Sequence, residues 1–250
     1  MSRTAAALII GNEILSGKIV DTNTTFLARV LFELGIELRR VVVCPDEVDT
    51  IGKDLSELRA THDFVFTSGG VGPTHDDVTI DGVAESFGRP VVRSVATEKM
   101  IRDYHGERTT EAHLRMANMP EGAEMIRSSD APWPTVVIEN VFVLPGVPEI
   151  FELKLADLRK RLDEGYEFHS QAVYTLCDEG EIAGLLERIA EHFQGVMVGS
   201  YVKWRAEDYR TKLTFDGIDP EAVAKAANML VAELDEKLFV RRESAEEGGA

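Results

Sequence analysis

One glycine-rich run stands out in the sequence, Thr67-Ser68-Gly69-Gly70-Val71-Gly72-Pro73-Thr74-His75-Asp76-Asp77. It follows the apolar run Phe64-Val65-Phe66 and precedes a helical pattern, which indicates a strand, a glycine turn and a helix start. Closely spaced glycines allow positive φ angles and leave backbone N–H groups open to a phosphate or another anion. The two aspartates add metal-binding or general-base capacity, although either could instead cap the following helix.

Two similar strand-to-loop junctions precede this run. The predicted strands of this part of the chain are 5–10, 36–43 and 63–67. Because helical patterns separate them, this βαβαβ order predicts a parallel sheet, whose carboxyl ends lie at one edge. We therefore expect the loops that begin at Gly11, near Asp46 and at Gly69 to converge there.

The remaining sequence divides into further segments. Residues 78–118 have a mostly helical pattern, and a helix over 148–162 ends the predicted α/β domain, residues 1–168. Residues 169–240 have the order βαββα of a small α+β domain, and 241–250 are polar enough to predict a flexible tail.

Composition narrows the class of protein. The 250 residues carry a net charge of −17, which disfavours binding to nucleic acid. The sequence has no apolar run close to the roughly 20 residues of a membrane span, and its start has no cleavable signal pattern, so we expect a cytoplasmic protein without a membrane partner. Cys44 and Cys177 lie in separate apolar runs, which predicts buried thiols.

The glycine run also resembles the phosphate-and-pterin loop of the molybdopterin-binding domain family, which includes the MoaB and Mog proteins. The motif Thr-Ser-Gly-Gly-x-Gly-Pro-Thr-x-Asp-Asp is most similar to the corresponding motif in the amino-terminal domain of the CinA branch. Further matches are 11–13 (Gly-Asn-Glu), 21–23 (Asp-x-Asn) and 144–148 (Leu-Pro-Gly-x-Pro). The resemblance implies a three-layer α/β fold over the first 165 residues. One segment, 131–134 (Ala-Pro-Trp-Pro), departs from the usual Ala-Pro-Gly.

The resemblance implies that Asp77 and Asp46 face the ligand pocket and that Glu13 belongs to the first-loop signature. If the protein is a metal-dependent hydrolase, these three carboxylates have specific roles. Asp77 and Asp46 would be catalytic, and together with Glu13 they would hold a divalent metal such as Mg, Mn or Co. Helix capping explains Asp46 and Asp77 as well, and an exposed surface carboxylate is the alternative for Glu13.

The predicted ligand-binding residues come from all four matching segments. Asn23 has an alternative role as a helix N-cap, and Pro145-Gly146 could be a structural turn only. The full set is Gly11, Asn12, Glu13, Asp21, Asn23, Ser68, Gly69, Gly70, Gly72, Pro73, Thr74, Asp76, Pro145 and Gly146.

Two functions fit these residues. The first is a metal-dependent nucleotide pyrophosphatase that cleaves a phosphate-bearing substrate such as ADP-ribose or a flavin dinucleotide. The second is a non-catalytic domain that binds molybdopterin or another pterin phosphate. Without an amidase or a flavin-synthesising domain, neither nicotinamide mononucleotide deamidation nor flavin adenylylation is expected. The resemblance further implies a homo-oligomer, either a dimer or a trimer.

Overall fold

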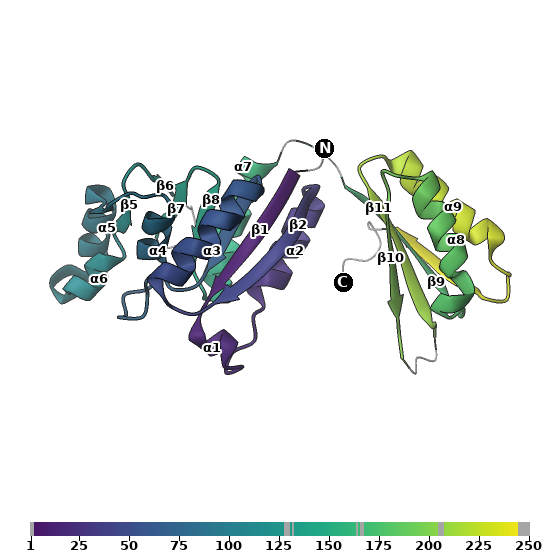
Figure 1. Cartoon of the computed structure of the whole chain (residues 1–250), viewed down its shortest axis with the longest axis horizontal. Coiled ribbons are helices and arrows are strands. Elements are labelled where there is room, and N and C mark those ends of the chain that lie inside the picture. Colours follow the sequence, from purple (N-terminus) through teal and green to yellow (C-terminus); the bar gives the residue numbers. More distant parts are fainter. Residues whose placement is uncertain are drawn as a thin grey trace. The chain divides into compact units, whose positions relative to one another are not determined.

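The computed structural model describes residues 3–127, 131, 133–163, 165, 168–204 and 208–244. The chain divides into two compact units, Met1–Glu164 and Gly165–Ala250, each with its own sheet (Figure 1). The boundary expected from the sequence lies slightly later, after residue 168. No helix in the described ranges is both long enough and apolar enough to cross a bilayer.

The first unit is built on a mostly parallel six-stranded sheet with the order β2-β1-β3-β8-β7-β6. Its four parallel strands are β1 (Arg3–Ile10), β2 (Ile36–Cys44), β3 (Phe64–Ser68) and β8 (Val141–Leu144). The antiparallel strands β7 (Thr135–Ile138) and β6 (Glu124–Ile126) complete the far edge. Residues 5–10 of β1 are buried, as expected for a central strand that is covered on both faces.

Helices cover both faces of this sheet. Alternate residues of β1 contribute to two separate cores, because successive side chains of a strand point to opposite faces. One core includes α2 (Asn23–Glu33) and α7 (Pro148–Leu162), and the other includes α3 (Val48–Thr61) and α4 (Thr79–Ser86). The predicted three-layer α/β fold is therefore confirmed.

Smaller elements surround these layers. Helix α1 (Asn12–Leu15) lies in the first loop, and α5 (Val95–His105), the 3-10 helix Gly106–Arg108 and α6 (Glu111–Arg115) follow α4. The short strands β4 (Val91–Arg93) and β5 (Asn118–Pro120) pair within the region predicted as mostly helical. Three-residue strands are too short for a hydrophobic period to reveal them.

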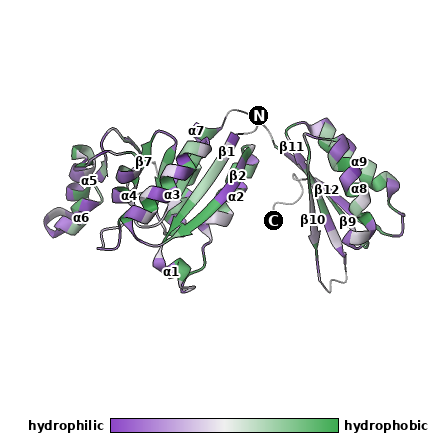
Figure 2. Ribbon diagram, in the orientation of Figure 1, coloured by the Kyte–Doolittle hydropathy of each residue, from purple (hydrophilic) through white to green (hydrophobic). Residues whose placement is uncertain are grey.

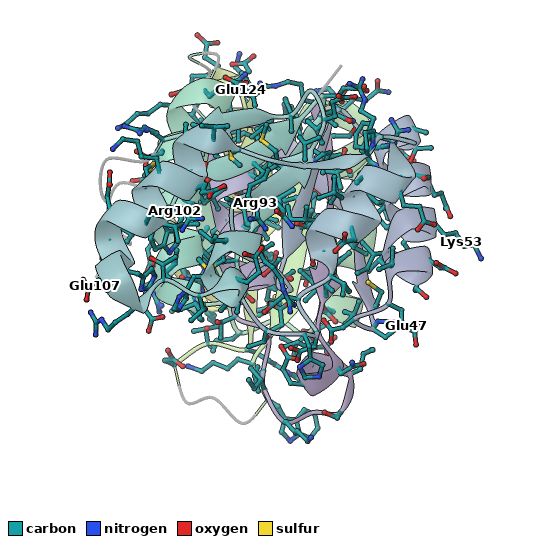
Figure 3. All side chains as sticks on the ribbon, turned by 90° about the vertical axis from the view of Figure 1, so that its left-hand side faces the viewer. Glu47, Lys53, Arg93, Arg102, Glu107 and Glu124 are labelled. Atoms are coloured by element: carbon teal, nitrogen blue, oxygen red, sulfur yellow. The ribbon has the colours of Figure 1, made fainter. Side chains whose placement is uncertain are left out.

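The distribution of polar residues follows the layers. Figure 2 shows hydrophobic residues along β1 and hydrophilic residues on the outer helices α4 and α5. Charged side chains such as Lys53 and Glu107 point outward at the rim of the first unit (Figure 3). These side chains are solvated, as is usual for charged residues.

The second unit has an antiparallel sheet with the order β10-β11-β9-β12 and two helices on one face (Figure 1). In chain order its elements are β9 (His169–Thr175), α8 (Glu179–His192), β10 (Met197–Val202), β11 (Thr211–Gly217), α9 (Pro220–Glu233) and β12 (Phe239–Ser244). The predicted smaller α+β domain is confirmed, with Cys177 buried in its core.

Strand β12 differs from the predicted tail, because residues 241–244 belong to the sheet and only 245–250 lie outside the described residues. Two arginines fix this strand to β9. The Arg242 side chain donates to Gln171 at 3.0 Å, and the Arg241 guanidinium lies 3.8 Å from the centre of the Tyr174 ring. Polar composition misled the prediction, because these cations bind to the sheet.

Candidate functional site

A cavity of about 570 Å³ opens in the first unit where β1, β3 and β8 end. Ten of the predicted site residues line it: Glu13, Asp21, Asn23, Ser68, Gly69, Gly70, Gly72, Asp77, Pro145 and Gly146. Six others lie outside its wall: Gly11, Asn12, Asp46, Pro73, Thr74 and Asp76. The expected convergence of loops at the carboxyl edge of the sheet therefore produces a cavity.

The glycine loop approaches the neighbouring backbone closely. Gly69 has a φ of 106°, and a Cβ atom at this position would lie only 2.1 Å from the carbonyl oxygen of Ile10. Gly70 follows with a φ of 63°. The buried Thr79 holds both residues, because its Oγ1 donates to the Gly69 carbonyl at 2.8 Å and its N–H donates to the Gly70 carbonyl at 3.0 Å. Only glycine fits at position 69, because a side chain would clash with Ile10 and the φ angle is positive.

This loop leaves backbone donors available at the cavity. The N–H groups of Gly70, Val71 and Gly72 make no hydrogen bond within the described part of the chain, and all three residues line the cavity. Successive N–H groups beside a left-handed turn form a concave site that favours anions. The loop can therefore bind a phosphate group through its backbone.

Asp77 shapes the glycine loop and does not cap α4. The N-cap of α4 is Val78, which makes no side-chain capping bond. Asp77 Oδ2 instead accepts from the N–H of Thr74 at 2.8 Å and lies 2.5 Å from its Oγ1. Asp77 Oδ1 has no hydrogen bond to a described residue. The carboxylate thus holds the loop and also lines the cavity.

Asp76 lies outside the cavity wall beside the same threonine. Thr74 Oγ1 lies 2.6 Å from Asp76 Oδ1, and this contact lowers the pKa of the exposed Asp76 carboxyl. The two aspartates of the motif therefore have different positions, and only Asp77 contributes to the cavity.

Asn23 is the first residue of α2 and not its N-cap. Its amide crosses to two neighbouring loops, since Nδ2 donates to Ser68 Oγ at 2.9 Å and to the Gly146 carbonyl at 3.0 Å. Asp21 has the capping role, because its Oδ1 accepts from the N–H of Thr24 at 3.1 Å. The plain N-cap interpretation of Asn23 is therefore wrong. This residue ties the loops together at the cavity.

The structure separates Asp46 from the other two predicted metal ligands. Asp46 Oδ2 accepts from the N–H of Asn12 at 2.8 Å, which positions the first loop from outside the cavity wall. Glu13 lines the cavity together with Asp77. No group of three His, Cys, Asp or Glu side chains suited to a metal occurs in the described ranges. The cavity itself thus offers the carboxylates of Glu13, Asp21 and Asp77.

Lys154 lines the cavity and was missed by sequence reasoning. It comes from α7, is only 5% exposed, and donates through Nζ to the Trp133 carbonyl at 2.6 Å and to Thr135 Oγ1 at 3.3 Å. Burial lowers the pKa of its ammonium group to about 8. A signal was present, because Lys154 falls at helical spacing between the apolar residues Phe151 and Leu158.

The rest of the cavity wall is mostly apolar. Trp133 belongs to it, and the ring of Tyr104 stands edge-on to the indole at a centroid distance of 5.3 Å. Pro132, in the segment that departs from the family pattern, lies outside the described residues. Further apolar residues of the wall are Ile14, Ile80, Met116, Pro134, Val136 and Ile150. Such a surface suits a planar ring attached to a phosphate.

These features define a class, an α/β domain with an anion-binding glycine loop and an adjoining apolar cavity. Residues 6–163 match the family described as "Probable molybdopterin binding domain", and residues 167–243 match "FAD synthase, middle domain". The chain therefore belongs to the molybdopterin-binding domain family, which confirms the resemblance.

Individual relatives agree with this assignment. A protein from Archaeoglobus fulgidus is 32% identical over 91% of this chain and 96% of its own length. A "Probable FAD synthase" from Caenorhabditis elegans is 31% identical over 91% of this chain, which spans only 49% of that relative. The crystal structure of CinA from Thermoplasma acidophilum is 32% identical and has a TM-score of 0.61, covering 64% of this chain and 98% of that one.

Proposed function

We propose that the cavity binds a nucleotide through its phosphates and that the protein hydrolyses the diphosphate of a substrate of the ADP-ribose or FAD type. One observation carries this proposal. A single cavity contains both the carboxylates of Glu13 and Asp77 and the glycine-loop N–H groups that have no partner among the described residues. Donors for phosphate oxygens and groups for a metal or a water molecule thus share one wall.

The backbone N–H groups of the loop would bind the phosphate oxygens. Their positions are set by Gly69, Gly70 and the buried Thr79, so they need little rearrangement when charge develops on the phosphate. Preorganised donors of this kind stabilise a transition state more than flexible side chains do. No covalent nucleophile is needed for such a reaction.

A divalent cation fits the donor set of this cavity. Hard cations such as Mg²⁺ are held by one or two carboxylates together with substrate phosphates, so a complete protein cage is not required. Glu13 would hold it together with the substrate phosphates, while Asp46 would position the first loop from outside. When bound, such a cation neutralises phosphate charge and lowers the pKa of a coordinated water.

The hydrolysis conserves atoms and electrons. The oxygen of water forms a bond to one phosphorus, and the bridging P–O bond of the diphosphate breaks. The proton of that water would go to Asp77 Oδ1, which has no hydrogen bond to a described residue. ADP-ribose would yield AMP and ribose 5-phosphate, and FAD would yield AMP and FMN.

A non-catalytic pterin-phosphate binding domain is the second candidate. The apolar part of the wall with Trp133 favours it, because a planar ring can lie there whether or not a bond is cleaved. The description of the matching family names molybdopterin. This function requires the glycine loop but no metal.

The test is product release from ADP-ribose, FAD and NAD in the presence of Mg, Mn or Co, or of a chelator. We expect metal-dependent cleavage that Asp77→Asn reduces at least tenfold, because the amide can still accept from Thr74 but carries no charge. The matched control is Asp81→Asn, an exposed residue in the first turn of α4, which should retain activity. Absence of cleavage over the whole panel would contradict the hydrolase and favour the pterin-binding domain.

A further inference from the structure

Lys154 is a buried cation that forms no ion pair with a described residue, although the more distant charge of Asp157 acts on it. Its two hydrogen-bond acceptors, the Trp133 carbonyl and the Thr135 hydroxyl, are neutral. It forms no ion pair with a residue in the described ranges, and Asp157, one turn along the same helix, is paired with Lys160 at 3.8 Å. The third N–H of its ammonium group is not used by the described chain.

Such a group is costly to the folded protein. Burial disfavours an unpaired ammonium, which is why the pKa of Lys154 falls to about 8. A methionine or leucine would fill this position of α7 without that cost, since the helix presents the apolar residues Phe151, Leu155 and Leu158 on the same side. Because Lys154 lies on the cavity wall, a bound anion would offset the cost of burying its charge.

We propose that Lys154 Nζ binds an anionic oxygen of the ligand, and thereby selects phosphate-bearing ligands over their neutral counterparts. The class of ligand rests on the proposed function, but the contact does not require turnover. Among the described residues of the wall, the other charged groups are the carboxylates of Glu13, Asp21 and Asp77, which would repel an anion. Lys154 is the lining cation that offsets them.

A contact made by the ammonium form couples binding to a proton. The ligand's negative charge favours the protonated lysine, so binding above pH 8 requires uptake of a proton from solvent. The preference for a phosphorylated ligand should therefore decline as the pH rises from 7 to 9.5. Lys154→Arg would keep its charge over this range and retain the preference.

Two matched ligand pairs test the contact by calorimetry, AMP against adenosine and FMN against riboflavin. Neither phosphorylated member contains a diphosphate, so hydrolysis cannot interfere. We expect the wild-type protein to prefer the phosphorylated member of at least one pair, and Lys154→Met to reduce this preference at least tenfold. Lys160→Met removes the same charge from an exposed position of α7, 82% exposed at its side chain, and should leave the preference unchanged.

Several results would overturn the proposal. These are an unchanged preference in Lys154→Met, an equal loss of phosphorylated and neutral ligands, or no preference in the wild-type protein. The outcome is distinguishable from that of the proposed function. Tight AMP or FMN binding that depends on Lys154, without cleavage of any diphosphate, would refute the hydrolase alone. If the protein cleaves a diphosphate with metal, and Lys154→Met prefers phosphorylated ligands as strongly as the wild-type protein does, the lysine contact alone would be refuted.

Discussion

Asn23 Nδ2 donates to Ser68 Oγ at 2.9 Å, which joins the start of α2 to the end of β3 beneath the cavity. Because the same amide also binds the Gly146 carbonyl, one buried side chain connects three loops. We expect Asn23→Ala to lower the free energy of unfolding of the first unit by about 1–3 kcal/mol, since buried acceptors lose their donor. Urea denaturation measures this loss.

The control for this change is Asn12→Ala. Asn12 is exposed, and its side chain makes no hydrogen bond to a described residue. Its removal should alter the free energy of unfolding by no more than about 0.5 kcal/mol. Equal effects of the two substitutions would mean that the Asn23 bridge contributes nothing of its own.

Gly69 and Gly88 provide a matched pair of positive-φ glycines. A Cβ at Gly88 (φ 61°) meets nothing within 4 Å, whereas a Cβ at Gly69 would clash with backbone at 2.1 Å. Gly88→Ala should therefore cost only the conformational strain of about 1–2 kcal/mol. Gly69→Ala should cost roughly 3 kcal/mol or more, because backbone must move. Thermal unfolding of both variants checks the order, and a reversed order would contradict the close approach.

The glycine loop and the layers of the first unit could be predicted because their signals are local. Residues 67–77 combine a strand end, glycines and a helix start within one short segment, and each is read from neighbouring residues. The apolar run 5–10 likewise predicts a central strand, and the structure buries it in β1. Parallel connectivity then places the loop ends at one edge.

The partners of individual side chains could not be predicted in the same way. Asn23 and its partner Ser68 are 45 residues apart in the sequence, and Lys154 and its partner Trp133 are 21 residues apart. Both contacts therefore depend on how the layers pack. A local rule offered Asn23 as an N-cap, but Thr22 occupies that position and the Asn23 amide donates to a neighbouring loop. For Asp46, the same packing brings the first loop to its carboxylate.

Lys154 gives the stability of the protein a specific pH dependence. Burial lowers its pKa from 10.5 to about 8, so the unfolded chain binds the proton more tightly and stability rises as the pH increases from 8 to 10.5. At pH 7 the charged lysine therefore destabilises the folded state by roughly 3 kcal/mol. Lys154→Met should stabilise the ligand-free protein at pH 7 by about 1–2 kcal/mol, after the loss of two hydrogen bonds.

Urea titrations at pH 7 and pH 9.5 measure this effect. The advantage of Lys154→Met over the wild-type protein should shrink at the higher pH, while Lys160→Met should follow the wild type at both. A variant that is less stable at both values would show that the hydrogen bonds to Trp133 and Thr135 outweigh the cost of burying the charge.

The fluorescence of Trp133 can be used to detect a ligand in the cavity. The chain has two tryptophans, and Trp204 lies in the second unit with 83% of its surface exposed. In Trp204→Phe, binding of AMP should shift the emission of Trp133 to shorter wavelength, because a ligand in the cavity excludes water from the indole. Trp133→Phe should abolish the shift. A shift that persists in Trp133→Phe would locate the ligand elsewhere.

The register of β12 on β9 sets Ser244 opposite Gln171. Among the described residues, the start of β9 and the end of β12 therefore lie on neighbouring points of adjacent strands. A unit with its two ends side by side can be spliced into a surface turn of an unrelated protein, or circularly permuted through a short linker, without stretching its sheet. The second unit is therefore suited to insertion into another protein or to circular permutation.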